Sequence, residues 1–228
     1  MTEADSAAQA RQALVQVRTA YRLLQAYHRR LFDIMNLLRN GMAERFGDLE
    51  AIWWGPPVRT RVPAAKVDPL TRWVLDYEPL ARFDLLWASA PTPEPGSFLV
   101  YVGHTGDTAL DDSFDEEPDP AKLQPAESTK TALSVAFRAI VDLREPQFFD
   151  GWYPVYEFIQ REGGETEAFW DDGEVHTIRR KNATIRFGGF SLDMADLATK
   201  DAIERSLVKP LAALIERALP AGVAAPAR

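Results

Sequence analysis

Seven carboxylates lie between Asp107 and Asp119, and this stretch contains no Lys or Arg. His104 precedes the first of them, directly after an apolar run. Carboxylate oxygens are the ligands that hard divalent cations prefer, and a histidine side chain titrates near neutral pH. The chemistry that these residue types suggest is therefore cation binding or acid–base catalysis.

The spacing of the carboxylates does not match a calcium-binding EF-hand loop. That loop needs oxygen ligands at positions 1, 3 and 5, a glycine at position 6 and a glutamate at position 12. If Asp111 is position 1, then Glu116 stands at position 6 and Lys122 at position 12. If Asp107 is position 1, then Ala109 stands at position 3. Both registers fail at a required ligand or turn residue.

Three interpretations of the acidic block remain. The first, which we adopt, is a hydrated loop over residues 107–127, because neighbouring carboxylates repel one another and blocks of like charge stay solvated. The second is a docking surface for a protein partner. The third is a metal-assisted hydrolase, with His104 and Asp107 as catalytic residues and Asp107, Asp111 and Asp112 as cation ligands.

The common nucleophile and nucleotide-binding motifs are missing. Residues 189–193 read GFSLD, which lacks the final glycine of a Gly-x-Ser-x-Gly elbow. The chain contains no Walker-type phosphate loop, no Gly-x-Gly-x-x-Gly and no His-Glu-x-x-His. It has no cysteine, which excludes disulfides and thiolate ligands. We therefore predict no cofactor.

The charge balance bears on the class of partner. The formal net charge is −8, and the acidic block carries seven of these charges, so the rest of the chain is nearly neutral. No basic stripe stands ready to neutralise phosphates, so a nucleic-acid partner is not expected. No run of 18 apolar residues predicts a membrane span. The absence of a signal-like N-terminus and of cysteine favours a cytoplasmic location.

Residues 6–46 are predicted to form one long helix that ends at Gly47. Apolar residues recur every seven positions in three neighbouring rows, and the first row consists of Val17, Leu24, Leu31 and Leu38. The stripe is broader than the seam of a two-stranded coiled coil, which favours a helix that covers a sheet or joins a bundle. A helix of this length spans about 60 Å, so we expect part of it to extend or to pair with another chain.

The middle of the chain, residues 70–192, is rich in strand-like segments. We predict strands over 73–77, 82–89, 97–103, 154–160, 174–180 and 183–192, with a hairpin turn at Lys181-Asn182. Residues 129–143 fit either a strand or a helix, and we favour a strand because their neighbours resemble antiparallel strands. There is little room for the crossover helices that parallel strands need.

A closing helix is predicted over 199–219, with a kink or break at Pro210 and a frayed tail over 220–228. The sequence therefore predicts a single α+β domain, residues 1–228. Its core is an antiparallel sheet of about five to seven strands, on which the long N-terminal helix and the C-terminal helix pack.

The adjacent tryptophans Trp53 and Trp54 fit either an interface or the core. Neighbouring side chains on an extended segment point to opposite sides, and exposed Trp is enriched at interfaces. The leading functional hypothesis is a non-enzymatic cytoplasmic protein that acts through protein–protein contacts. Leu24 and Leu31 would mediate self-association, and Trp53 and Trp54 would contact a partner. The alternative is the hydrolase described above.

Overall fold

The computed structural model describes residues 3–55, 82–110, 122–145, 148–156 and 172–220. The chain divides into two compact units, residues 1–37 and residues 38–228, which are described separately below. One helix, α1 (Glu3–Phe46), begins in the first unit and ends in the second. Gly47 ends this helix with a φ of 85°, and its N–H donates to the carbonyl of Ala43 at 3.0 Å. Glycine adopts this left-handed conformation at little cost, so the predicted helix and its stop are confirmed.

The second unit contains an antiparallel sheet of six strands in the order β1-β2-β3-β4-β6-β5. The strands are β1 (Glu50–Gly55), β2 (Arg82–Ala88), β3 (Phe98–Thr105), β4 (Ala132–Leu143), β5 (His176–Arg179) and β6 (Ala183–Asp193). The predicted α+β class and the number of strands are confirmed. The preferred strand over 129–143 and the hairpin around Lys181-Asn182 are confirmed as well. The strand predicted over 73–77 lies outside the described residues.

After β6 and the short 3-10 helix η8 (Met194–Leu197), the C-terminal helical segment runs without a break from Lys200 to Ala218. It consists of α3 (Lys200–Ile203), a π-helical turn η9 (Glu204–Val208) and α4 (Lys209–Ala218). The Thr199 hydroxyl caps it by accepting from the N–H of Ala202 at 3.1 Å. Pro210 has no N–H for the preceding turn, and the chain widens into the π-helical turn just before it. The predicted irregularity is therefore a local widening of one continuous helical segment.

One predicted strand is wrong. Residues 152–156, which overlap the strand expected over 154–160, form a short helical turn, and residues 157–160 lie outside the described residues. Trp152 and Val155 are both buried, and a spacing of three residues places two side chains on the same side of a helix. Pro154 fits the first turn of a helix, where a missing N–H costs little. Burial of Trp152 and Val155 therefore favours a helical turn over the strand that the weak apolar–polar alternation of residues 154–160 indicated.

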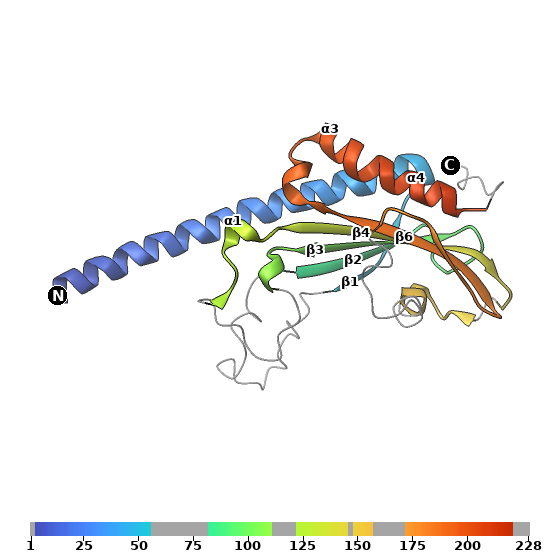
Figure 1. Cartoon of the computed structure of the whole chain (residues 1–228), viewed down its shortest axis with the longest axis horizontal. Helices are drawn as coiled ribbons and strands as arrows, with labels where there is room; N and C mark the ends of the chain where they lie inside the picture. The colour runs from blue at the N-terminus through green and yellow to red at the C-terminus, as the bar shows by residue number, and fades with distance from the viewer. Residues whose placement is uncertain (1–2, 56–81, 111–121, 146–147, 157–171, 221–228) are drawn as a thin grey trace. The chain divides into compact units, whose positions relative to one another are not determined.

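The two faces of the sheet pack against different elements. On one face, which we call the helix side, Arg186 Nη1 donates to the carbonyl of Ala218 in α4 at 2.9 Å. On the same side, the ring of Phe98 meets that of Phe46 at the end of α1, with centroids 5.2 Å apart. Figure 1 shows the C-terminal helical segment lying along the sheet near β4 and β6.

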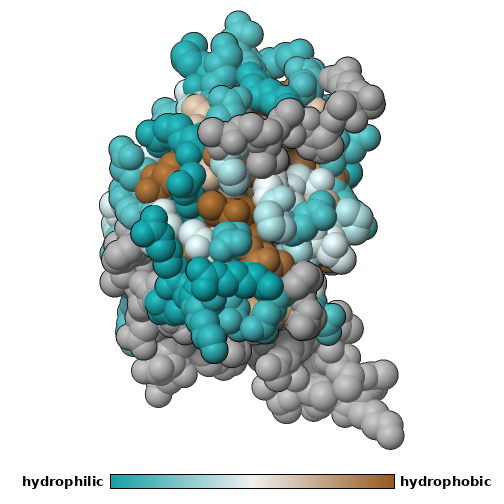
Figure 2. Space-filling view, turned by 90° about the vertical axis from the view of Figure 1, so that its right-hand side faces the viewer, coloured by the Kyte–Doolittle hydropathy of each residue, from teal (hydrophilic) through white to brown (hydrophobic). Residues whose placement is uncertain are grey.

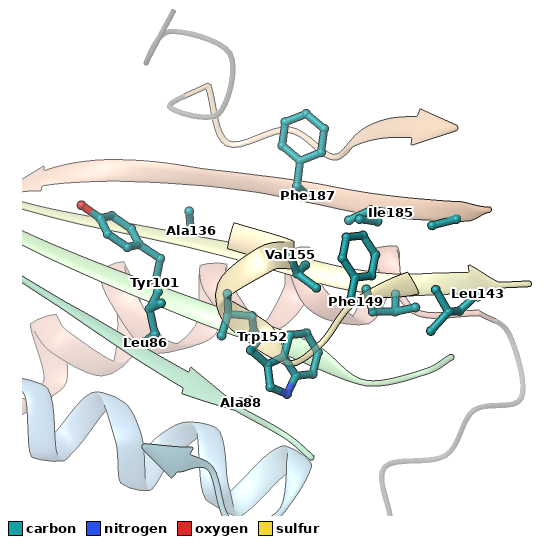
Figure 3. Packing of buried hydrophobic residues seen from close by; sticks show 13 residues of the cluster. Leu86, Ala88, Tyr101, Ala136, Leu143, Phe149, Trp152, Val155, Ile185 and Phe187 are labelled. Atoms are coloured by element: carbon teal, nitrogen blue, oxygen red, sulfur yellow. The ribbon is translucent and has the colours of Figure 1, made fainter. Parts of the chain in front are cut away.

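The opposite face, the turn side, carries a second buried cluster under the helical turn 152–156. Figure 3 shows Trp152 and Val155 on this turn in front of the sheet, with the C-terminal helical segment behind it. Trp152 Nε1 donates to the carbonyl of Ala90 at 2.7 Å, which fixes the turn to the loop after β2. The buried members of this turn-side cluster are Leu86, Ala88, Leu99, Tyr101, Ala136, Ile140, Leu143, Phe149, Trp152, Val155, Ala183, Ile185 and Phe187. The central strands are therefore buried on both faces.

One face of the molecule is mainly hydrophilic where the structure describes it (Figure 2). In the view of Figure 2, hydrophobic residues occupy a small central area and hydrophilic residues surround them. No helix in the described ranges has an apolar stretch long enough to cross a bilayer.

Candidate functional site

His104 lies near the end of β3 on the helix side of the sheet. Its neighbours in register are Phe83 on β2 and Leu133 on β4, and its side chain is only 1% exposed. Neighbouring core residues enclose this imidazole. The residue thus has the environment of a core histidine, and its predicted catalytic role stays a prediction.

Asp107 has a structural role at the start of the acidic block. Its Oδ1 accepts from the N–H of Ala109 at 2.8 Å, where the short helix η3 (Thr108–Leu110) begins. Asp111 and Asp112 lie outside the described residues. Among the residues that the structure does describe, no three His, Asp or Glu side chains form a group that would hold a metal ion. The hydrolase thus remains a prediction that metal titration can test.

Trp53 and Trp54 lie on the edge strand β1, where they pair with Leu86 and Leu85 of β2. A β-bulge between Ala51 and Trp53 shifts the register next to this pair. Their side chains are outside the description, so their assignment to an interface stays a prediction.

The first unit exposes a large apolar surface. Every residue from Gln9 to Ala26 in α1 is exposed. The large hydrophobic side chains among the exposed residues of α1, which we call the α1 apolar surface, are Leu14, Val15, Val17, Tyr21, Leu23, Leu24 and Phe32. Of the two leucines predicted to mediate self-association, Leu24 is 41% exposed and Leu31 is 0% exposed. Only Leu24 therefore offers a surface to another molecule without rearrangement.

The charges of this part of α1 have one sign. Between Asp5 and Asp33 the helix carries arginines but no acidic residue. If Val17 and Leu24 are placed at the first position of successive heptads, then four of these arginines fall at the second or sixth position, about a quarter to a third of a turn from the rows of Leu14, Val17, Tyr21 and Leu24. They are Arg11, Arg18, Arg22 and Arg29, and all four are exposed. The helix thus has an apolar side and a basic side.

Arg138 is the most unusual polar residue of the second unit. It lies in the middle of β4 on the turn side, between Leu99 of β3 and Phe187 of β6, and it is 2% exposed. Within the described structure, its Nε and Nη1 atoms have no hydrogen-bond partner. Its guanidinium carbon lies 4.7 Å from the centroid of the Tyr156 ring. Arg138 is therefore a buried cation that packs against an aromatic face without a hydrogen bond to these two nitrogens.

Burial changes the electrostatics of this arginine. Loss of hydration lowers the pKa of Arg138 from its ordinary value to about 10, although Tyr156 and Tyr101 oppose the change. The guanidinium still stays protonated at neutral pH. A pKa difference of this size corresponds to roughly 3 kcal/mol of destabilisation of the charged form. A fold that retains such a charge normally pairs it.

Tyr156 and Tyr101 extend this arrangement across the sheet. Their rings stack with centroids 5.8 Å apart, and the Tyr101 hydroxyl donates to Asp84 Oδ1 at 2.7 Å. The Tyr101 side chain passes over Gly103, where a Cβ atom would collide with its hydroxyl. We call Arg138, Tyr156, Tyr101 and Asp84 the Arg138 cluster. It joins β2, β3 and β4 to the helical turn 152–156.

Sequence reasoning missed Arg138 because it followed one face of β4 only. The alternating row through Leu133, Val135 and Phe137 indicated a single buried side, which is the helix side. Arg138 belongs to the other row, between Ala136 and Ile140. In that row one apolar residue stands on each side of Arg138. This pattern was the available signal that both faces of the strand are buried.

These features define an α+β protein with a six-stranded antiparallel sheet and an N-terminal helix that exposes an apolar surface. The chain belongs to the PM0109 family, whose model matches residues 7–219. That description names no activity or ligand. No curated protein and no solved structure matched the chain.

Proposed function

We propose that the protein is a non-enzymatic cytoplasmic protein that acts through protein–protein contacts, and that α1 pairs with α1 of a second copy. The observation that carries this proposal is the α1 apolar surface, whose seven large hydrophobic side chains are exposed. Leu14, Val17, Tyr21 and Leu24 share one side of the helix, and contiguous exposed apolar surface is typical of an interaction site.

The seven-residue spacing supports a like helix as the occupant. Val17 and Leu24 stand one heptad apart, and Leu14 and Tyr21 repeat the same interval on an adjacent row. Two helices with the same repeat can interlock their side chains along a shared seam. The arginines at the second and sixth heptad positions lie beside that seam and not within it, so pairing two copies can leave them in water.

The burial energy is of the same order as the cost of association. A fully buried Val, Leu or Phe side chain contributes about 1.5–3 kcal/mol relative to an exposed one. Side chains that are about half exposed contribute roughly 1 kcal/mol each, so two copies of the α1 apolar surface provide on the order of 10 kcal/mol. This is comparable to the estimated cost of about 4–15 kcal/mol for lost translational and rotational freedom.

Light scattering of the full chain after size exclusion tests the proposal. We expect a dimer or larger assembly at tens of micromolar, and we expect Leu24→Asp to dissociate it because the charge enters the seam. Ala26→Asp is the matched control, since it adds the same charge at an exposed position two residues along, about 200° around the helix from Leu24 and away from the seam. A monomeric wild type, or equal dissociation by both variants, would contradict the proposal.

Trp53 and Trp54 are proposed contacts for a further protein partner. This part of the proposal rests on residue type and on their place in β1, an edge strand of the sheet that the structure describes, since edge strands are common sites of pairing. Trp→Ala variants at both positions should leave self-association through α1 unchanged.

A further inference from the structure

We propose that Arg138 binds the carboxylate group of a small organic anion, whose aromatic or aliphatic body contacts the Tyr101 and Tyr156 rings on the turn side of the sheet. The proposal concerns the second unit alone and does not depend on self-association through α1.

The first argument is the unmet hydrogen-bonding capacity of Arg138. A guanidinium has five N–H donors and no acceptor. In the described part of the chain, neither Nε nor Nη1 finds an acceptor, although the side chain is 2% exposed. Buried donors in native proteins are nearly always paired, so an unpaired buried guanidinium points to an acceptor that binds there.

The one carboxylate of the Arg138 cluster already accepts a hydrogen bond. Asp84 Oδ1 accepts from the Tyr101 hydroxyl at 2.7 Å. Tyr101 in turn stacks on Tyr156, and Tyr156 on Arg138. The cluster therefore places two aromatic rings between the carboxylate of Asp84 and the guanidinium, and the positive charge is left available to an incoming anion.

The surroundings select the class of anion. The side chains that flank Arg138 on the turn side are Leu99, Phe187, Ala136 and Ile140, all of them apolar. A phosphate dianion would need several cationic or N–H donors, whereas Arg138 is the one cation of the Arg138 cluster as defined above. A single guanidinium matches a monocarboxylate, and the apolar walls match a hydrocarbon or aromatic body.

Thermal melting of the full chain with matched probes tests the inference. The probes are phenylacetate and octanoate, their neutral amides, and inorganic phosphate, each at millimolar concentration and pH 7. A carboxylate present at one hundred times its Kd should raise the Tm of the wild type by roughly 5–10 °C for a chain of this size. The amides should not, because they lack the charge. A wild type that no carboxylate shifts, or that amides or phosphate shift equally, would overturn the inference.

Variants locate the effect. Arg138→Met should abolish the carboxylate-dependent shift, whereas Arg144→Met should preserve it. Arg144 is the matched control because it follows the same strand and its side chain is exposed. A shift that survives in Arg138→Met would assign the binding elsewhere and contradict the proposal.

The variant without ligand separates a binding role from a structural one. If Arg138 serves an external anion, Arg138→Met should melt no more than about 2 °C below the wild type, because it removes an uncompensated buried charge. A large loss of stability would instead show that a group of the chain itself pairs with Arg138. Should the variant fail to fold, the ¹H–¹⁵N signal of Arg138 Nε in the wild type gives a second measurement. It should move on addition of phenylacetate and stay fixed with the amide.

Discussion

The guanidinium carbon of Arg138 lies 4.7 Å from the centroid of the Tyr156 ring, on the face of the sheet opposite α4. The strand β4 supplies the cation, and the helical turn 152–156 supplies the ring. A desolvated cation over an aromatic face gains about 2 kcal/mol. This contact offsets part of the cost of burying Arg138, and it ties the helical turn to the centre of the sheet.

Replacing Tyr156 should therefore separate the role of the ring from that of the hydroxyl. Tyr156→Leu should destabilise the protein by about 2 kcal/mol more than Tyr156→Phe does, because only the phenylalanine retains an aromatic face over Arg138. Urea unfolding of both variants measures the difference. Equal stabilities would mean that the ring face makes no net contribution.

Tyr101 and Gly103 should behave as a coupled pair. Tyr101→Phe removes the hydrogen bond to Asp84 and should cost about 1.5–3 kcal/mol, because the acceptor is a carboxylate. Gly103→Ala places a Cβ atom against the same hydroxyl and should displace it. The combined variant should lose less stability than the two single variants together. Additive losses in a double-mutant cycle would contradict this arrangement.

Trp152 should be the residue of the helical turn on which stability depends most. It is almost fully buried in the turn-side cluster, and its indole N–H donates to the carbonyl of Ala90. Trp152→Ala should cost about 3–5 kcal/mol. The neighbouring Tyr153 is exposed, so Tyr153→Ala is the control and should cost less than about 1 kcal/mol. Similar losses in urea unfolding would show that the turn does not bury Trp152 as described.

Divalent cations should leave the melting temperature unchanged if the protein is not a metal-assisted hydrolase. Ligand stabilisation grows with the ratio of free ligand to Kd, so millimolar Mg²⁺, Mn²⁺ or Ca²⁺ would reveal a site of even modest affinity. Asp107→Asn is the matched variant, because an amide oxygen can still accept from the N–H of Ala109. A metal-dependent rise in Tm that this variant abolishes would favour the hydrolase over the proposed function.

Several elements were predictable because their signals are local. The seven-residue period of α1 and the stop at Gly47 depend on residues within a turn or two of one another. The hairpin around Lys181-Asn182 and the alternation in β4 are local as well. The antiparallel sheet that they indicated is observed, although its edge strand β1 was not predicted. The helix over 199–219 was also correctly placed, and the effect of Pro210 was absorbed by the π-helical turn η9.

The burial of the turn-side face was decided by tertiary structure. Alternation in β4 identifies which residues share a face, but it does not say whether a second layer covers the other face. Here the helical turn 152–156, distant in sequence from β3 and β2, supplies that layer. The same packing explains why residues 154–156 are helical and not the predicted strand. In the helical conformation Trp152 and Val155 lie on one side and are buried together.

The sequence by itself determined the α+β class, the antiparallel connectivity and the apolar side of α1, because each follows from periodicity and turn chemistry along a short stretch of chain. Only the tertiary structure showed that His104 is enclosed in the core and that Arg138 is a buried cation next to Tyr156. The physical reason is that burial and the pairing of charges depend on residues from β2, β3, β4 and the helical turn, which meet only when the chain has folded.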